Sequence, residues 1–312
     1  MLRRNFIKKT VIATGLSLLF PKLVFGSKEE KSSNVKVLKP TPGNWSPEAV
    51  TLAWVGHSTV LINFFGKMIL TDPILFEKVG IYIWGTTFGQ SRYSPPALEA
   101  DEIPKPDIVL LSHAHMDHTD YKSLKFLTDK YPKQIDCITA YNTSDVTDDL
   151  QWKSIKEMDW NDEYSLPGLS FKALQVKHFG WRYPWEKDRS KGFMKDGRSF
   201  NAYVIERNGK RILFGGDTAL QNYFARDVKT NVDIAIMPIG AYNPWRFNHC
   251  NPEEALKMAR SIGAKVFIPI HCGTFKQGVE PVGEPLKIVR ESVSNFSLEL
   301  GIKEIGGTFS AG

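Results

Sequence analysis

Cysteines, internal repeats and long apolar runs are scarce or missing in this chain of 312 residues. Its three cysteines, Cys137, Cys250 and Cys272, are too few and too widely spaced for a disulfide framework or a cysteine-based zinc module. The absence of a repeat argues against a solenoid or a propeller. Hydrophobic residues make up 42% of the chain and aromatic residues 12%, so it can build a sizeable core and is not largely disordered.

An excess of one charge sign is also missing once the N-terminus is set apart. The formal net charge is +6, from 40 basic and 34 acidic residues. Residues 1–26 hold five of the basic residues and no acidic one, so the remainder has 35 against 34 and a net charge of +1. A nearly neutral body gives no electrostatic reason to expect a nucleic-acid partner.

The first 26 residues are typical of an export signal. Arg3 and Arg4 precede an apolar run at 11–20, which is shorter than the ~18–20 residues of a membrane span. Paired arginines before such a run resemble a twin-arginine signal, with an ordinary secretory signal or an uncleaved anchor helix as alternatives. We therefore expect residues 1–26 to direct export in a bacterium, to the periplasm or its membrane. Residues 27–48, rich in Lys, Glu, Ser and Pro, are expected to form a linker or wrapping arm.

Residues 49–312 are predicted to form one α/β domain. Short apolar runs broken by Gly56 and Gly66 predict strands, and Asn208-Gly209 predicts a hairpin turn. Strands are expected at 51–55, 59–65, 67–70, 107–111, 169–176, 200–205, 211–214, 233–239 and 265–270, and helices at 121–131, 252–262 and 286–300. Strands and helices mix in both halves without a linker-like break, which indicates an α/β arrangement.

Three of the seven histidines lie in one short motif, Ser112-His113-Ala114-His115-Met116-Asp117-His118. The motif follows an expected buried strand, and the carboxyl ends of such strands bind ligands in α/β proteins. Imidazole nitrogen and carboxylate oxygen are the ligands of Zn²⁺ sites that keep a position open for water. A polar surface loop with chance histidines is the alternative, but the clustering favours a metal site.

Three further candidates each follow an apolar strand: His178, Asp217 and His271. Taken singly, each could be an ordinary buried polar residue. Together with the motif they would complete a two-metal set, with three groups on each ion and a carboxylate between the ions. Two such ions can share a water whose pKa falls to about 7, so that hydroxide attacks phosphorus or a carbonyl carbon.

These residues resemble the metallo-β-lactamase superfamily, whose ligands follow the order H-x-H-x-D-H, then His, Asp and His. The runs 54–59, 70–73, 248–255 and 271–275 resemble more narrowly the N-acylphosphatidylethanolamine phospholipase D-like branch, close to the ascorbate-phosphate lactonase branch. The resemblance implies a four-layer αββα sandwich with the metal site at one edge of the two sheets.

The resemblance also implies the role of each ligand. The first zinc would be held by His113, His115 and His178, the second by Asp117, His118 and His271, and Asp217 would bridge them. The presence of His115 favours a hydrolase over the di-iron oxidoreductases of the superfamily, which use a carboxylate at that position.

Other residues are expected around the metals. Asp72 would accept a hydrogen bond from a ligand imidazole, unless it only ends a strand in an Asp-Pro turn. His249 would contact a substrate oxygen or protonate the leaving group, and His57 would either pack or contact substrate. The aromatic and basic stretch 181–200 could form a lid on a phosphate or lipid headgroup, or a plain surface loop, and the apolar stretch 76–88 could form a second wall. All three cysteines are expected to stay free, although the sequence leaves pairing of Cys250 with Cys272 open.

The sequence therefore predicts an exported binuclear zinc hydrolase with a metal-bridging hydroxide and with Asp117, His249 and His57 as catalytic residues. The expected activity is that of a phospholipid phosphodiesterase of phospholipase D type, acting on a small-molecule or phospholipid substrate and in contact with a membrane surface. A lactonase on a sugar-derived lactone is the nearest alternative. An inactive metal- or lipid-binding protein is the alternative of another class, and the oligomeric state stays undefined.

Overall fold

The computed structural model describes residues 35–187, 189, 197–229 and 231–311, and the account below concerns these residues. The predicted export signal at 1–26 lies outside the described residues, as does the first part of the predicted arm. The rest of the arm lies along the domain, where the backbone N–H of Leu38 donates to the carbonyl oxygen of Ile305 at 2.9 Å. No helix in the described part of the chain is long and apolar enough to cross a membrane.

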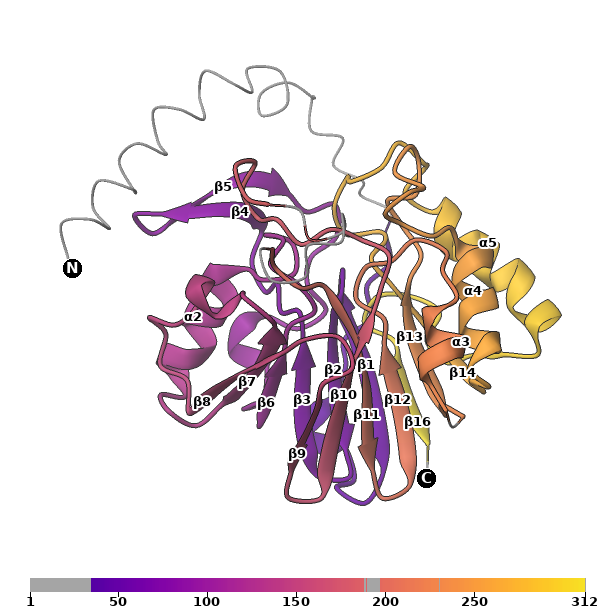
Figure 1. Ribbon diagram of the computed structural model, residues 1–312, viewed down its shortest axis with the longest axis horizontal. Helices are drawn as coiled ribbons and strands as arrows, with labels where there is room; N and C mark the ends of the chain where they lie inside the picture. The colour runs from indigo at the N-terminus through magenta and orange to yellow at the C-terminus, as the bar shows by residue number, and fades with distance from the viewer. Residues whose placement is uncertain (1–34, 188, 190–196, 230, 312) are drawn as a thin grey trace. The chain divides into compact units, whose positions relative to one another are not determined.

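Two seven-stranded mixed sheets form the centre of the described domain (Figure 1). The first has the order β16 (Thr308–Ala311), β1 (Val50–Gly56), β2 (Thr59–Phe64), β3 (Lys67–Thr71), β6 (Ile108–Leu110), β7 (Asp136–Ala140) and β8 (Ser154–Met158). The second has the order β15 (Glu299–Leu300), β14 (Val266–Ile270), β13 (Ile234–Pro238), β12 (Lys210–Phe214), β11 (Asn201–Arg207), β10 (Leu169–Gln175) and β9 (Glu163–Leu166). In both sheets antiparallel strands continue into parallel ones, β3 to β8 and β12 to β15. Loops that follow the parallel strands of a sheet therefore meet at one of its edges.

Strands β1 and β2 carry apolar side chains on both faces of the first sheet, so both faces are covered. Trp54 of β1 packs in the core between the sheets, whereas the next residue, Val55, packs in the core on the outer face. Val60 and Ile62 of β2 likewise contribute to the inner core, and Leu61 to the outer one. Because successive residues of a strand point to opposite faces, strands that are apolar at every position must be buried on both sides.

Helices cover the two outer faces (Figure 1). Beside the first sheet lies α2 (Tyr121–Lys130), whose Leu124 and Leu127 complete the outer core there. Beside the second sheet lie α3 (Tyr223–Asp227), α4 (Pro252–Ser261) and α5 (Glu284–Ser292). Helix α4 begins as its sequence predicts, because Asn251 accepts from the N–H of Glu254 at 2.9 Å and the Glu254 carboxylate accepts from the N–H of Asn251 at 3.0 Å. The predicted four-layer αββα sandwich is confirmed.

Of two predicted local features, the hairpin turn at 208–209 is present and the helix at 286–300 is shorter than predicted. The predicted hairpin turn is confirmed: Asn208 and Gly209 join β11 to β12 with φ of 49° and 72°, the left-handed values that this turn requires. The predicted helix over 286–300 is wrong beyond Ser292, where a 3₁₀ turn at Val293–Phe296 and strand β15 follow. Ser297 has a left-handed φ of 55°, which ends the turn and lets β15 pair in parallel with β14.

The apolar stretch 76–88 takes a form that the sequence did not suggest. It enters a separate hairpin of β4 (Lys78–Ile83) and β5 (Thr86–Ser91) instead of a buried wall. Trp84 at its turn is 92% exposed, and Phe88 on β5 is 59% exposed. In Figure 1 this hairpin stands beyond one end of the first sheet, and the ring of Tyr82 on β4 lies 5.9 Å from that of Tyr121 at the start of α2. Trp84 and Phe88 therefore face solvent, whereas Tyr82 packs against α2.

Candidate metal centre

All seven predicted ligands lie in loops that follow strands. The motif follows β6, His178 follows β10, Asp217 follows β12 and His271 follows β14. Main-chain hydrogen bonds tie these loops together across the two sheets: the N–H of Asn201 donates to the oxygen of Ser112, and the N–H of His271 donates to the oxygen of His57, both at 2.9 Å. The candidate centre is thus built from both halves of the sandwich.

Three imidazoles, His113, His115 and His178, make up what we call the first group. His113 Nε2 lies 2.8 Å from His115 Nδ1, and His115 Nδ1 lies 3.2 Å from His178 Nε2. Two nitrogens on one tetrahedral zinc, each ~2.05 Å from the ion, would lie about 3.3 Å apart. The first group therefore has nearly the spacing that one zinc ion requires.

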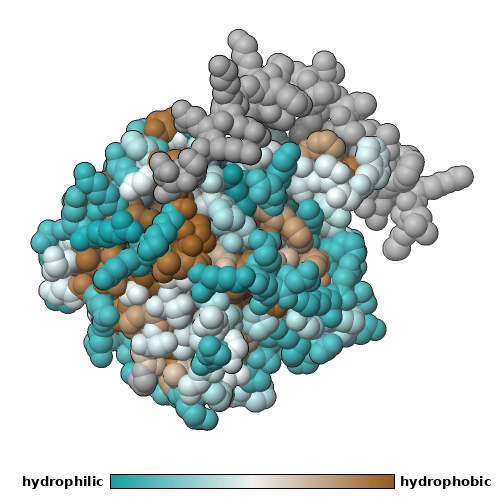
Figure 2. All heavy atoms as spheres, turned by 180° about the vertical axis from the view of Figure 1, so that it is seen from behind, coloured by the Kyte–Doolittle hydropathy of each residue, from teal (hydrophilic) through white to brown (hydrophobic). Residues whose placement is uncertain are grey.

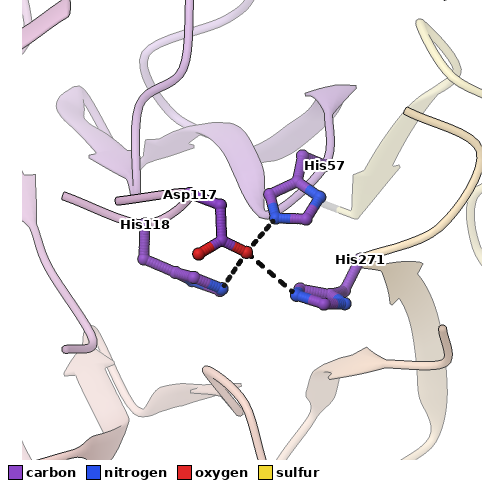
Figure 3. A group of neighbouring side chains, drawn as sticks. All are labelled: His57, Asp117, His118 and His271. Carbon is purple, nitrogen blue, oxygen red and sulfur yellow. Dashed lines mark hydrogen bonds and ion pairs between the residues drawn. The ribbon is translucent and has the colours of Figure 1, made fainter. Parts of the chain in front are cut away.

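Asp117, His118 and His271 make up the second group, shown in Figure 3 with His57. Asp117 Oδ2 lies 3.5 Å from His118 Nε2 and 3.6 Å from His271 Nε2. Figure 3 shows both rings turned toward this one carboxylate. These separations leave room for one ion between the three side chains.

Asp217 lies between the two groups. Its Oδ2 is 3.1 Å from both His118 Nε2 and His271 Nε2, and 3.9 Å from His178 Nε2 in the first group. The carboxylate is 2% exposed. Asp217 is thus the side chain that can reach an ion in either group.

Several buried polar atoms of the cluster have no hydrogen-bond partner. They include Asp217 Oδ1, and also His118 Nε2 and His271 Nε2, which lie 3.1 Å from Asp217 Oδ2 but without hydrogen-bond geometry. A buried polar atom without a partner is costly, and such atoms are rare in folded proteins. Here they are nitrogen and oxygen atoms aimed at common points, so bound cations would satisfy them together. The residues present fit a two-metal site.

Electrostatics divides the histidines into two kinds. Burial lowers the pKa of His113 and His178 well below the ordinary value and that of His115 to about 4, so these rings are neutral, as metal ligands must be. Burial also acts on His118 and His271, but Asp217 and Asp117 outweigh it, and the pKa of His271 rises to about 9. The carboxylates therefore attract positive charge to the second group, and a metal ion there would replace protons.

Asp72 is held in the predicted position beside a ligand. It is fully buried, and its Oδ2 lies 2.6 Å from His118 Nδ1. Ser112 donates to it twice, from its N–H at 2.7 Å and from its Oγ at 2.6 Å. Because Asp72 accepts a hydrogen bond from His118 Nδ1, the other ring nitrogen, Nε2, faces Asp217 and is the one that can bind an ion. Ser112 was a residue of the motif with no predicted role.

The two histidines outside the ligand set also lie in the cluster. His249 Nδ1 is 3.7 Å from Asp217 Oδ2, and His57 Nε2 is 3.2 Å from Asp117 Oδ2. His57 is 1% exposed, whereas the side chain of His249 is 12% exposed. His249 can therefore face a substrate, and His57 can act through Asp117. All seven histidines of the chain now lie in one cluster.

The arginines of the predicted lid are occupied within the fold. Arg182 Nη1 donates to the carbonyl oxygens of Ala114 at 2.6 Å, inside the motif, and of Thr119 at 3.0 Å, directly after it. Arg198 forms ion pairs with Glu186 and Asp145, and Arg189 pairs with Asp159. Each of these three arginines already holds a carbonyl or a carboxylate, so in the described part of the stretch they serve the fold, as the surface-loop alternative implies. Residues 190–196 of the stretch lie outside the described residues.

Aromatic rings of the same stretch do approach the centre. The ring of Phe179 lies 4.3 Å from that of His115, and Trp181 lies 4.8 Å from Phe179. The ring of Phe275 lies 5.3 Å from that of His57. The metal centre is thus flanked by apolar rings on both sides, and Phe179 and Phe275 are neighbours that the sequence did not single out as such.

The three cysteines are free and buried, as expected. Cys250 Sγ contacts the carbonyl oxygen of Pro238 at 3.3 Å, and Cys137 packs in the core under α2. Neither Cys250 nor Cys272 joins any group of potential metal ligands in the described part of the chain.

Comparisons with known proteins agree with this centre. Residues 67–272, well over half of the chain, match the model of the β-lactamase superfamily domain. The chain is 27% identical over 253 residues to an N-acyl-phosphatidylethanolamine-hydrolyzing phospholipase D of Caenorhabditis elegans, covering 75% of this chain and 66% of that one. It is 25% identical over 248 residues to a metal-dependent hydrolase of Methanospirillum hungatei, covering 77% and 91%.

Solved structures share the fold. The metallo hydrolase Igni18 of Ignicoccus hospitalis superimposes with a TM-score of 0.60 at 18% identity, covering 85% of this chain and 99% of that one. This chain spans about two thirds of the length of the Caenorhabditis relative. The predicted family is confirmed.

Proposed function

Because this chain belongs to the metallo-β-lactamase superfamily, we propose that it is a metal-dependent hydrolase and, more narrowly, a binuclear zinc phosphodiesterase of phospholipase D type. The observation that carries the proposal is the position of Asp217 Oδ2, 3.1 Å from two nitrogens of the second group and 3.9 Å from one of the first. A carboxylate in that place can serve two ions at once. Two ions suit a phosphodiester, whose attacking and leaving oxygens both carry charge.

In this proposal some residues would bind the two metal ions and others hold those ligands in place. The first group and the second group would hold one zinc each, with Asp217 between them. When bound, the two ions supply a nucleophile at neutral pH and positive charge for the substrate oxygens. Asp72 fixes the ring of His118, and Arg182 fixes the loop that carries four of the ligands. The cluster is therefore rigid before substrate arrives, which favours catalysis by preorganised charge.

Exposure indicates the side from which substrate approaches. The side chains of Asp117 and His249 are 18% and 12% exposed, whereas those of His118 and His271 are fully buried. Burial lowers the pKa of His249 to about 4, so its ring is neutral at pH 7. A neutral imidazole donates a hydrogen bond to a phosphate oxygen better than it transfers a proton to a leaving group. We therefore propose that His249 donates a hydrogen bond to a phosphate oxygen of the substrate.

A lipid substrate is supported by the aromatic surroundings. Phe179 and Trp181 flank the first group, and three aromatic side chains in neighbouring loops are exposed: Trp185 at 59%, Trp245 at 53% and Phe247 at 81%. The surface drawn in Figure 2 is mostly hydrophilic, with hydrophobic residues in separate patches. We propose that these aromatic side chains contact the membrane surface, and that the enzyme acts in the periplasm or at the membrane, as the predicted export signal would imply.

The experiment is a parallel assay on metal-loaded protein of measured metal content. The substrates are an N-acylated phosphatidylethanolamine, a bis-aryl phosphodiester and a sugar-derived lactone. We expect two zinc ions per chain and release of a phosphatidic acid from the first substrate. Chelation and Asp217→Asn should both abolish this release. Lactone opening without phosphodiester cleavage would replace the proposal by the lactonase alternative. Two bound zinc ions without activity on any substrate would support a binding protein.

A further inference from the structure

One oxygen of Asp117 receives hydrogen bonds from two residues outside the ligand set. His57 Nε2 lies 3.2 Å from Asp117 Oδ2, and Gln277 Nε2 donates to the same oxygen. Figure 3 shows the ring of His57 directed at this oxygen from the side opposite His118. Asp117 is the most exposed ligand of the second group, so without such donors its side chain could rotate.

Gln277 reaches Asp117 from a loop of the other sheet. It lies six residues after His271, on the segment between β14 and α5, and is partly buried. Its backbone oxygen accepts from the indole N–H of Trp245 at 3.2 Å, which fixes the loop from the opposite side. A neutral amide cannot compete with histidine for zinc, but its NH₂ group is a good donor to a carboxylate.

The backbone conformation of His57 is strained. Its φ is 49°, a left-handed value that costs a residue other than glycine about 1–3 kcal/mol. Three hydrogen bonds hold it there: its N–H donates to Thr274 Oγ1 at 2.8 Å, and its carbonyl oxygen accepts from Trp54 Nε1 at 2.7 Å and from the N–H of His271 at 2.9 Å. The strained turn carries an imidazole aimed at a metal ligand, and its backbone also anchors another ligand.

We propose that His57 and Gln277 are positioning residues, which hold Asp117 so that the second group can bind its ion. Both donors act on Oδ2, so the two together limit rotation of the carboxylate, and neither touches the first group. The loss of either should weaken the second metal ion and leave the first ion bound. This inference concerns metal binding alone and does not depend on the substrate proposed above.

The test is a double-mutant cycle read by metal binding. Co²⁺ is titrated into metal-free protein, followed by its visible absorption bands and by metal content. His57→Asn suits the left-handed backbone, because asparagine tolerates it, but is too short to reach Asp117. Gln277→Leu keeps the size and removes the donor. The matched control is Gln151→Leu, since Gln151 donates to Asp129 at 3.4 Å on the surface.

We expect each single variant to weaken the second Co²⁺ by about 10–100-fold, as for other residues that orient a ligand. The double variant should lose less than the product of the two single losses, because both donors share one oxygen. Unchanged affinity for the second Co²⁺ in both single variants would overturn the proposal. Equal weakening of both ions would also overturn it, since that result indicates general damage to the fold. Gln151→Leu should bind both ions as the unaltered protein does.

Discussion

Replacing Asp72 by asparagine tests how far the centre depends on a residue that binds no ion. Asp72 is fully buried and accepts two hydrogen bonds from Ser112 and one from His118. Asparagine keeps the size and one acceptor but turns an NH₂ group toward His118 Nδ1, where a donor already points. The ring then loses the partner that orients it, and its other nitrogen no longer points steadily at Asp217.

Two magnitudes follow from this geometry. Metal affinity at the second group should fall by about 10–100-fold, which is about 1.4–2.7 kcal/mol. Metal-free Asp72→Asn should be less stable by about 1.5–3 kcal/mol, because the buried ring of His118 loses one hydrogen bond to a charged partner but keeps Asp217 and Asp117 beside it. The assays are zinc competition with a chromophoric chelator and urea unfolding of metal-free protein.

The matched control is Asp120→Asn, at another buried carboxylate two residues after His118. Asp120 accepts from the N–H of Ser123 at 3.0 Å at the start of α2, and asparagine caps helices as well as aspartate does. This variant should bind zinc normally. If Asp72→Asn also binds two zinc ions with unaltered affinity, the hydrogen bond to His118 does not orient the ligand, and the reasoning fails.

Three further predictions follow from the same structure. His249→Leu removes the donor and should keep both metal ions and lower kcat by about 10²-fold, the usual cost of one lost donor at a reacting oxygen; equal kcat would remove its role. Metal-free protein should lose stability as pH rises, because the pKa of His271 is about 9 in the folded protein and 6.5 when unfolded. The stabilisation from protonated His271 is complete below pH 6.5 and is lost as the pH rises through 9. The Tm of metal-free protein should therefore fall across that window, while the Tm of zinc-loaded protein does not. A Tm of metal-free protein that stays constant over the window would contradict this. Arg182→Leu should weaken both metal ions, whereas Arg226→Leu, at an exposed ion pair in α3, should change neither; measured zinc stoichiometry decides, and normal loading of Arg182→Leu would refute the bracing of the loop.

Much of the fold could be predicted because its strands are defined locally. Asn208-Gly209 can adopt the turn that joins β11 to β12 with little strain, and the apolar runs 202–205 and 212–214 lie on either side of it. The error in the predicted C-terminal helix has a non-local cause. The residues after Ser292 carry an apolar pattern compatible with a helix, but Glu299 is paired with Val266, more than thirty residues earlier in the chain. A local pattern does not contain that pairing.

In the site, too, some features could be predicted from the sequence and others depend on non-local contacts. Each predicted ligand follows an apolar strand, and parallel strands bring their carboxyl ends together, so the grouping is a consequence of topology. The roles of Arg182 and Gln277 were beyond sequence reasoning for another reason. Which carbonyl or carboxylate a flexible polar side chain reaches depends on loop conformation, and Gln277 reaches Asp117 across 160 positions of the chain. An arginine in a loop is equally compatible with a phosphate and with the two carbonyl oxygens that Arg182 contacts.

The gathering of every histidine into one cluster makes the protein its own spectroscopic reporter. If ¹⁵N is incorporated only into histidine, the spectrum of the 312-residue chain contains seven ring systems, and each belongs to the centre or its immediate neighbours. Ring nitrogens that bind an ion, carry a proton or accept a hydrogen bond differ widely in chemical shift, so occupancy of each group and the tautomers of His57 and His249 become separate signals. A polyhistidine purification tag would obscure them and should be removed first.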